Sequence, residues 1–397
     1  MTEDQVFGPE RGFGLYVHWP YCARICPYCD FNVYAAKDRD KQPLVHALLE
    51  DMDGHSQRFD THPALTSVFF GGGTPSLLNP SELGALVDRA RVRFGLTGDG
   101  SVGKGVEITL EANPNDVLKG DIAGWAAIGV NRLSLGVQSF DDQALAFLGR
   151  DHGAEDARRA LDLALKHFRS VSIDLIYARP GHSLDAWRAE LELALGLGVH
   201  HLSLYELTIE AATPFGKRVS RGDLAPLPDD AQAELYELTQ TVCEAAGFPA
   251  YEVSNHACGV EHRSRHNLTY WRSGDWIGIG PGAHGRLTLD GTRYETIAAR
   301  RPQDYVSAVQ STGVGWSEHT PLSLSDLAVE VLTMGLRSDE GVRIAAIEDL
   351  LGHAVDRIKL DEFQSQGLAT LDTGLLALSL SGRLLADRIV AELLGAA

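Results

Sequence analysis

Short apolar runs alternate with amphipathic stretches through the first half of the chain. The apolar runs, each of which predicts a buried strand, cover residues 15–17, 67–70, 106–110, 132–136, 170–177 and 201–207. Helical periodicity separates them, most clearly in residues 43–58, 155–168 and 184–197. Strands separated by helices of this length pair in parallel through right-handed crossovers.

This repeat predicts the fold class. Six β/α units precede residue 213, whereas a closed barrel of this type has eight. We therefore expect an α/β fold that begins with an open, partial (β/α)6 barrel. Ligands of parallel sheets bind at the carboxyl ends of the strands, so the loops that follow the strands are the expected location of a site.

The pattern changes near residue 213, which we take as the end of the barrel (residues 1–213). The next part, residues 214–319, is an α+β segment with a predicted helix over 230–246 and a predicted strand over 250–254. The rest of this segment is loop-rich and dense in histidine, tryptophan and glycine.

Residues 320–397 predict a winged-helix-like module. Two helical patterns are followed by short strands over 368–371 and 375–378 and by a last helix over 381–394. The module contains six Lys/Arg and twelve Asp/Glu, whereas a wing that reads DNA is normally basic. We expect it to have a structural or protein-contact role.

Composition narrows the classes further. The 397-residue chain has a formal net charge of −19, which argues against a nucleic-acid partner and against anionic lipid. No apolar run approaches the roughly 20 residues of a membrane span, and residues 1–11 lack the apolar core of a signal peptide. Five cysteines, three of them clustered, are typical of a reducing compartment. We expect a cytoplasmic protein, as a monomer or a homodimer.

The clustered cysteines, Cys22, Cys26 and Cys29, directly follow the first strand. Thiolates this close on one loop do not form a strain-free disulfide framework, but they can face one soft metal centre. Three sulfurs suit a cubane iron–sulfur cluster with one iron open to another ligand. Zinc is a poorer match, because only Cys26 and Cys29 have the usual spacing and no second pair follows. Aromatic residues and prolines interleave the three cysteines, which disfavours a chance group of buried thiols.

Other polar residues and glycines also end predicted strands. Gly71, Gly72 and Gly73 follow the second strand, where missing side chains let a ligand approach the backbone, although such turns are common. Glu111 ends the third strand, where a carboxylate suits ribose hydroxyls, or equally caps a helix. Asp174 interrupts an apolar strand, where a charge is costly unless it is paired.

A second group of residues is His266-Asn267-Leu268-Thr269-Tyr270-Trp271, followed by Trp276 and His284. Tyrosine and tryptophan suit a large planar ligand, and histidine is a common axial ligand of heme iron. By residue type alone, a polar-edged core is the better interpretation. His256, Cys258 and His262 are weaker alternatives as ligands, and Cys243 lies in a helical apolar pattern that predicts a buried thiol.

The Cys-x3-Cys-x2-Cys motif followed by an aromatic residue resembles the radical S-adenosylmethionine (SAM) superfamily. Tyr-Val-His-Trp-Pro-Tyr-Cys (16–22) and Cys-Pro-Tyr-Cys-Asp-Phe (26–31) resemble the branch of oxygen-independent coproporphyrinogen III oxidases, and the chain is most similar there to the HemW heme chaperones. The resemblance implies a [4Fe-4S] cluster on Cys22, Cys26 and Cys29. It also implies that SAM chelates the open iron through its amino and carboxylate groups.

The resemblance further implies contacts at positions that match the motifs of the family. Those for the cofactor pocket are Tyr16, Gly72, Gly73, Thr74, Glu111, Gln138, Arg150 and Asp174. His266, in the HNxxYW motif, matches a feature of HemW and is the implied heme contact. Ala178 and Arg179 depart from the Gly-Leu or Gly-Met of the family. Arg179 is therefore either a carboxylate contact at the pocket mouth or a solvated loop charge.

The oxidases use radical chemistry on SAM to decarboxylate coproporphyrinogen III. They have a fourth cysteine where this chain has Phe31, and a longer segment before the cluster than residues 1–13 supply. The resemblance therefore implies a heme chaperone that binds the cluster, SAM and heme and delivers heme to an acceptor protein, with an electron donor also expected. The alternative is an oxygen-independent coproporphyrinogen III dehydrogenase. A winged-helix redox regulator is disfavoured by the acidic tail.

Overall fold

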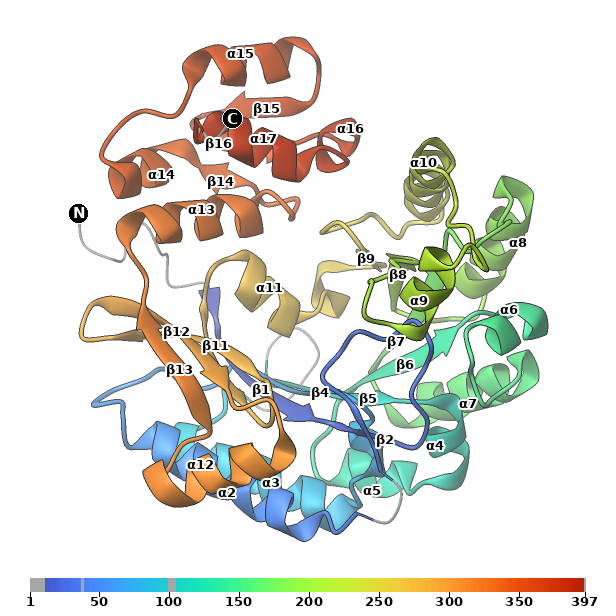
Figure 1. Cartoon of the computed structure of the whole chain (residues 1–397), viewed down its shortest axis with the longest axis vertical. Helices are drawn as coiled ribbons and strands as arrows, with labels where there is room; N and C mark the ends of the chain where they lie inside the picture. Colours follow the sequence, from blue (N-terminus) through green and yellow to red (C-terminus); the bar gives the residue numbers. More distant parts are fainter. Residues whose placement is uncertain (1–10, 37–38, 99–104, 396–397) are drawn as a thin grey trace.

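The computed structural model of the chain describes residues 11–36, 39–98 and 105–395. Eleven strands of this described part form one mixed sheet, in the order β13-β12-β11-β10-β1-β4-β5-β6-β7-β8-β9 (Figure 1). Within the same residues, no helix combines the length and the apolar character needed to cross a bilayer.

Six strands of this sheet pair in parallel and in chain order. They are β1 (Phe13–Trp19), β4 (Ser67–Gly72), β5 (Glu107–Ala112), β6 (Arg132–Gln138), β7 (Ser170–Tyr177) and β8 (His201–Glu206). Their apolar side chains are removed from solvent, as Leu15, Val68 and Leu133 illustrate at 0% exposure. The predicted partial barrel of an α/β fold is confirmed.

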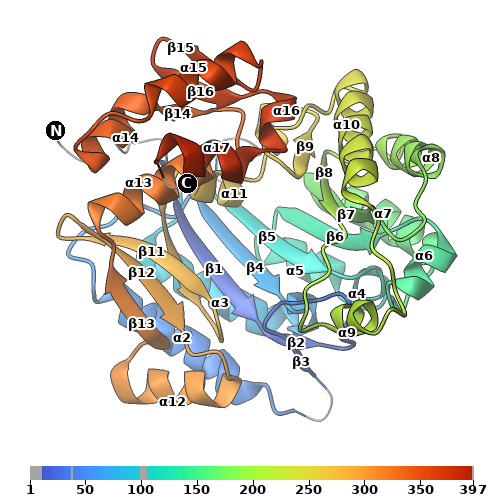
Figure 2. The same ribbon diagram turned by 45° about the horizontal axis from the view of Figure 1, so that its top comes forward.

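Helices cover the outer face of these strands (Figure 2). They are α2 (Gln42–Ser56), α3 (Pro80–Phe94), α4 (Pro114–Lys119), α5 (Ile122–Ala127), α6 (Asp142–Phe147), α7 (Ala154–His167) and α8 (Leu184–Leu195). Helix α3 begins at a capping box, in which the Asn79 side chain accepts from the Glu82 amide and the Glu82 carboxylate accepts from the Asn79 amide, both at 2.9 Å. These bonds satisfy amides that have no partner inside the helix.

The segment after residue 213 extends the same sheet. Strand β10 (Asp275–Ile279) pairs in parallel with β1, and β11 (His284–Leu289), β12 (Thr292–Ala298) and β13 (Trp316–Pro321) continue antiparallel. The α-helices described in this segment are α9 (Pro214–Ser220), α10 (Asp229–Ala245), α11 (Arg265–Trp271) and α12 (Pro302–Thr312). After residue 213 the strands no longer all pair in parallel and in chain order, but they remain part of the same sheet.

The predicted strand over residues 250–254 is wrong. The chain turns there, closed by a 3.1 Å bond from the Tyr251 amide to the Asn255 carbonyl, and the strand β9 (Asn255–Ala257) begins only afterwards. Tyr251 is fully buried, and its hydroxyl is hydrogen-bonded to His201 at 2.8 Å. The buried tyrosine therefore explains why the sequence pattern looked like a strand although the backbone turns at this point.

The C-terminal module has its own apolar core. It contains α13 (Leu324–Gly335), β14 (Val342–Arg343), α14 (Ile344–Leu351), α15 (Arg357–Ser365), β15 (Ala369–Asp372), β16 (Leu375–Leu378), α16 (Leu380–Arg383) and α17 (Ala386–Leu393). The last predicted helix is thus split in two. Ion pairs of Arg263 with Asp339 (2.8 Å) and of Arg286 with Glu330 (2.6 Å) connect the module to the rest of the chain.

A buried carboxylate connects helix α2 to the sheet extension. Asp51, which is 0% exposed, accepts from the Tyr305 hydroxyl at 2.6 Å and from the Gly315 amide at 3.0 Å. His55 lies 3.0 Å from the same carboxylate and accepts a bond from the Trp316 indole at 3.0 Å. One side chain therefore satisfies polar groups from three separate segments.

We expect Asp51→Ala to lower the free energy of unfolding by about 3 kcal/mol or more, because each buried donor left without a partner costs about 1–3 kcal/mol. Urea denaturation followed by circular dichroism measures this loss. Asp53→Ala, on the same helix, is the control: Asp53 is 24% exposed and pairs with Arg89 and Arg93, and such pairs contribute less than about 1 kcal/mol. Equal losses in the two variants would contradict the role assigned to Asp51.

Candidate functional site

The cysteine loop follows β1 at the carboxyl end of the sheet. It includes the short strands β2 (Tyr21–Cys22) and β3 (Tyr34–Ala35), which pair in parallel. Two backbone bonds attach the loop to the end of β4, from the Gly73 amide to the Trp19 carbonyl (2.7 Å) and from the Thr74 amide to the Tyr21 carbonyl (2.9 Å). The thiols therefore lie beside the glycine turn.

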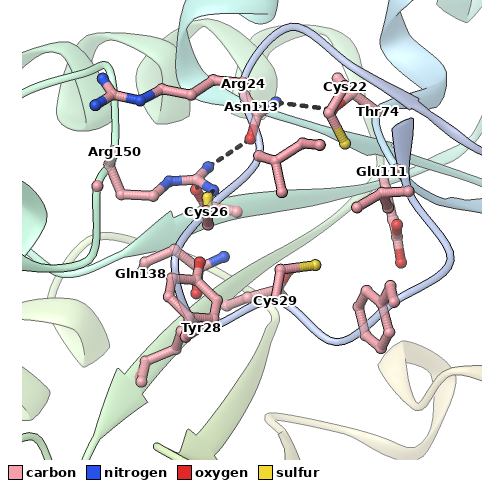
Figure 3. Close-up of a pocket in the computed structure, with 18 of the residues that line it drawn as sticks. Cys22, Arg24, Cys26, Tyr28, Cys29, Thr74, Glu111, Asn113, Gln138 and Arg150 are labelled. Atoms are coloured by element: carbon pink, nitrogen blue, oxygen red, sulfur yellow. Dashed lines mark hydrogen bonds between the residues drawn. The ribbon is translucent and has the colours of Figure 1, made fainter. Parts of the chain in front are cut away.

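A cavity of about 330 Å³ opens between this loop and the strand ends (Figure 3). Ten of the predicted site residues line it: Cys22, Cys26, Cys29, Gly72, Gly73, Thr74, Glu111, Gln138, Arg150 and Asp174. They come from the cysteine loop and from the ends of β4, β5, β6 and β7, with Arg150 on the loop after α6. The structure thus brings together residues that are up to 152 positions apart in the sequence.

The three cysteines are free thiols. No three His, Cys, Asp or Glu side chains among the described residues converge on a position for a single metal ion. Each cysteine of a cubane cluster binds a different iron, so its sulfurs stand apart around a shared space. Figure 3 shows the Cys22 and Cys29 sulfurs toward that space and the Cys26 sulfur beside Arg150. This donor set fits an iron–sulfur cluster better than one ion.

Arg150 connects the cysteine loop to the strand ends. Its guanidinium donates to the Cys26 sulfur at 3.2 Å, to the Gly136 carbonyl at 3.0 Å and to the Asn113 side chain. These bonds hold the guanidinium between the cysteine loop and the ends of β5 and β6. Its Nε has no hydrogen-bond partner in the described structure although it is buried, which leaves one donor for a ligand.

The glycine turn requires its glycines. A Cβ on Gly73 would lie 2.8 Å from the Trp19 carbonyl oxygen and 2.9 Å from that of Tyr21, both of them backbone atoms. Gly72 has φ +102°, and a Cβ there would lie 2.4 Å from the His18 ring. Any side chain at these positions would push the cysteine loop away from β4.

Two carboxylates face the cavity from β5 and β7. Burial, reinforced by the charge of Asp174, raises the pKa of Glu111 to about 8, although the Gly72 amide donates to it at 3.1 Å. Burial also raises the pKa of Asp174 to about 6, against hydrogen bonds that include one from the Ser134 hydroxyl at 3.1 Å. A cationic or hydroxyl-bearing ligand group at this wall would stabilise the charged carboxylates.

Tyr16 and His266 line a second cavity of about 180 Å³, which shares Glu111 and Asp174 with the first. His266, on α11 (Arg265–Trp271), is 1% exposed and stacks on Phe69. Its Nδ1 is hydrogen-bonded to the Ser67 hydroxyl at 2.9 Å and its Nε2 to the Tyr270 hydroxyl at 2.6 Å. Burial lowers its pKa to about 3, so the ring is neutral.

A third cavity, of about 380 Å³, adjoins the first through Phe31, Gly72 and Glu111. Five of the remaining lining residues carry rings. The remaining residues come from β1, the cysteine loop, α11, β10, the turn after β10 and the start of β11: Tyr16, His18, Asn32, Tyr270, Trp276, Gly282 and His284. His256, Cys258 and His262, the weaker heme alternatives, line none of the three cavities. His284 belongs to the second group of residues in the sequence, but the resemblance selected His266 in that group as the heme contact.

Both expectations for Arg179 are wrong. Arg179 is 8% exposed, and its guanidinium donates to the Glu190 carboxylate at 2.8 Å and to the Ile176 carbonyl at 2.8 Å. It therefore pairs with helix α8 and lines none of the three cavities. The sequence could not reveal this, because its partner lies eleven residues further on in an otherwise amphipathic helix. Asn113, which Arg150 holds at the rim, was likewise not singled out although it follows Glu111 at a strand end.

Comparison with known proteins gives consistent matches. Residues 16–194 match the radical SAM superfamily and residues 322–385 match the HemN C-terminal domain. The chain is 41% identical to heme chaperone HemW of Escherichia coli (74% of this chain, 75% of that one) and 35% identical to heme chaperone HemW of Mycobacterium tuberculosis (98% and 96%).

It is also 38% identical to the mitochondrial radical S-adenosyl methionine domain-containing protein 1 of Bos taurus, over 98% of this chain and 88% of that one. Among solved structures, coproporphyrinogen III oxidase (HemN) from Escherichia coli, a radical SAM enzyme, matches with a TM-score of 0.78 at 20% identity, covering 98% of this chain and 92% of that one. At this identity the likeness supports the fold.

The raised pKa of Glu111 predicts a pH dependence of stability. Between about pH 4.5, the usual value, and about pH 8, the folded value, the folded chain binds more protons than the unfolded chain. Stability therefore falls as the pH rises through this window. As the pH rises through this window, the Tm of Glu111→Gln should fall less than the Tm of the unsubstituted protein. Calorimetry of both proteins without cluster or SAM measures the difference. Glu50→Gln, at an exposed position of α2, should keep the original slope; an unchanged slope in Glu111→Gln would contradict the assignment.

Proposed function

The chain belongs to the radical SAM superfamily, in the family of the HemW heme chaperones and radical S-adenosyl methionine domain-containing protein 1, and on this basis we propose that it binds heme and transfers it to acceptor proteins. The Mycobacterium tuberculosis relative named heme chaperone HemW matches 98% of this chain at 35% identity. The observation that carries the proposal is the aromatic-lined third cavity, which adjoins the cavity of the three cysteines at Phe31, Gly72 and Glu111.

In this proposal Cys22, Cys26 and Cys29 hold a [4Fe-4S] cluster, and the cavity beside them holds SAM. The superfamily implies both cofactors. When bound, they supply one-electron cleavage chemistry. The backbone of Gly72 and Gly73 leaves room for a ligand at the end of β4, and Arg150 donates a hydrogen bond to the Cys26 sulfur.

The opposite walls of that cavity suit the two ends of an amino acid. Glu111 and Asp174 offer carboxylates for an ammonium group or for ribose hydroxyls. Arg150 retains a free Nε for a carboxylate. Gln138, at the end of β6 with φ +67°, and Thr74 complete the set of proposed SAM contacts. Tyr16 lies further in, on the walls of the second and third cavities.

The alternative, coproporphyrinogen III dehydrogenase, has weaker support. Phe31 stands where the oxidases have a fourth cysteine, and it is 65% exposed at the boundary between the first and third cavities. An exposed apolar ring at this boundary suits the face of a porphyrin. The five unpaired thiols support the proposed location in a reducing cytoplasm.

Replacing Cys22, Cys26 and Cys29 together by alanine should remove the cluster. We expect iron and sulfide contents near zero after anaerobic reconstitution, with loss of the visible absorbance of the cluster. Cys243→Ala and Cys258→Ala are matched controls, because Cys243 is buried in α10 and Cys258 lies outside all three cavities. Both controls should keep their iron. Iron retained in the triple variant would contradict the site.

The function is tested with the reconstituted protein and two substrates. Titration with heme should give a saturable change in the Soret region, followed by transfer of the heme to an apo-hemoprotein. The same preparation, given coproporphyrinogen III, SAM and a reductant without oxygen, should form no protoporphyrinogen IX. Product formation would support the dehydrogenase instead, and absence of a saturable heme signal would overturn the chaperone proposal.

A further inference from the structure

The third cavity has the volume and the aromatic lining of a site for a flat ligand with apolar faces. Its volume of about 380 Å³ lies within the range of ligand pockets, about 300–1,000 Å³. Tyr270 and Trp276 form one wall, with ring centroids 4.6 Å apart in an edge-to-face arrangement. Phe31 contributes an exposed ring at the boundary with the first cavity.

The histidines around this cavity differ in their ring partners. His18 is 6% exposed and uses both nitrogens, Nδ1 with the Tyr16 hydroxyl at 2.9 Å and Nε2 with the Asn32 carbonyl at 3.0 Å. His266, one layer deeper, is also hydrogen-bonded at both nitrogens. Iron ligation by either ring would require breaking an existing hydrogen bond.

His284 is the exception. It lines the third cavity, its side chain is exposed, and its ring makes no hydrogen bond to any residue that the structure describes. A neutral imidazole with a free nitrogen is the form that binds heme iron. Although the residue is open to solvent on one side, partial burial lowers the pKa of His284, and this favours the neutral form.

One hydrogen bond and two close contacts at neighbouring glycines fix the backbone around His284. The Trp276 indole donates to the His284 carbonyl at 2.9 Å, so the cavity wall and the histidine are connected. A Cβ on Gly278 would lie 2.0 Å from the same carbonyl oxygen, which shows how closely β10 and β11 approach. Gly282 has φ +80° and packs against Asn32, where a Cβ would lie 2.7 Å from the amide nitrogen.

The charges that act on His284 are of both signs: Arg286 and Arg300 are opposed by Glu295 and Glu318, and Glu111 lines the cavity itself. Arg286 is already paired with Glu295 and Glu330. Arg300, whose charge also acts on His284 together with that of Glu318, is exposed and forms no ion pair with any described residue. The guanidinium of Arg300, which is not among the lining residues, can bind a carboxylate, such as a porphyrin propionate, that extends beyond the cavity.

We propose that His284 is the residue of this chain that binds the heme iron, with the porphyrin in the third cavity against Tyr270, Trp276 and Phe31. This inference rests on the proposed function and names the site of its cargo. It assigns to His266 a different part, that of a buried positioning residue that holds the Tyr270 hydroxyl at 2.6 Å.

Heme titration of four variants tests the assignment, with the axial ligand followed by absorbance and electron paramagnetic resonance. We expect His284→Ala to lose the nitrogen-ligand signature and to bind heme at least about tenfold more weakly. His284→Cys should replace that signature with a thiolate one, which a merely structural role would not produce. His266→Ala should keep the nitrogen signature, and His46→Ala, at an exposed position of α2, should behave as the unsubstituted protein.

The outcomes separate this inference from the proposed function. If the unsubstituted protein binds no heme, the function itself fails. If it binds heme but His284→Ala keeps both the affinity and the nitrogen signature, the assignment of His284 is overturned. Loss of the signature in His266→Ala alone would overturn it in favour of the deeper histidine. Cluster iron content and circular dichroism of each variant show that the comparison is made between folded proteins.

Discussion

Parallel pairing in chain order is the constraint on which the site depends. Because β1 and β4 to β8 run in the same direction, their carboxyl ends meet at one edge of the sheet. Each following loop therefore contributes to the same space: thiols after β1, bare backbone after β4, carboxylates at β5 and β7. A single strand in the opposite direction would have placed one of these groups about 20 Å away, since a strand of six residues has roughly that length.

The sequence predicted most of this arrangement, because it is local. Apolar runs and helical periodicity define β/α units without knowledge of their partners, and the end of each strand marks its site residues. Contacts between residues far apart in the sequence were harder to predict. The apolar pattern at residues 250–254 reflects a buried Tyr251 bonded to His201, and the pairing of Arg179 with Glu190 depends on how α8 packs. The extension of the sheet by β10 to β13 depends on β10 pairing with β1, which is more than 250 residues earlier.

The histidines show the same limit. In the sequence His266 has the more suggestive neighbours, since tyrosine and tryptophan follow it directly. In the fold those neighbours satisfy it: Ser67, from a strand 199 residues away, takes one nitrogen and Tyr270 the other. His284 has no such neighbours in sequence and reaches the cavity only because β10 and β11 pair tightly. Availability of a ring nitrogen is a property of the folded neighbourhood and could not be predicted from residue type.

Asn32 connects the two cavities mechanically. Lying three residues after Cys29, it donates to the carbonyls of Pro281 (2.8 Å) and Arg300 (2.7 Å), which flank the turn before His284 and the end of β12. One amide thus connects the cysteine loop to the opposite rim. The two compartments therefore do not change shape independently, because a displacement of the cysteine loop acts on the rim through these bonds. Under the proposed function, oxygen damage to a cluster on this loop would alter the rim of the proposed heme site through the same bonds.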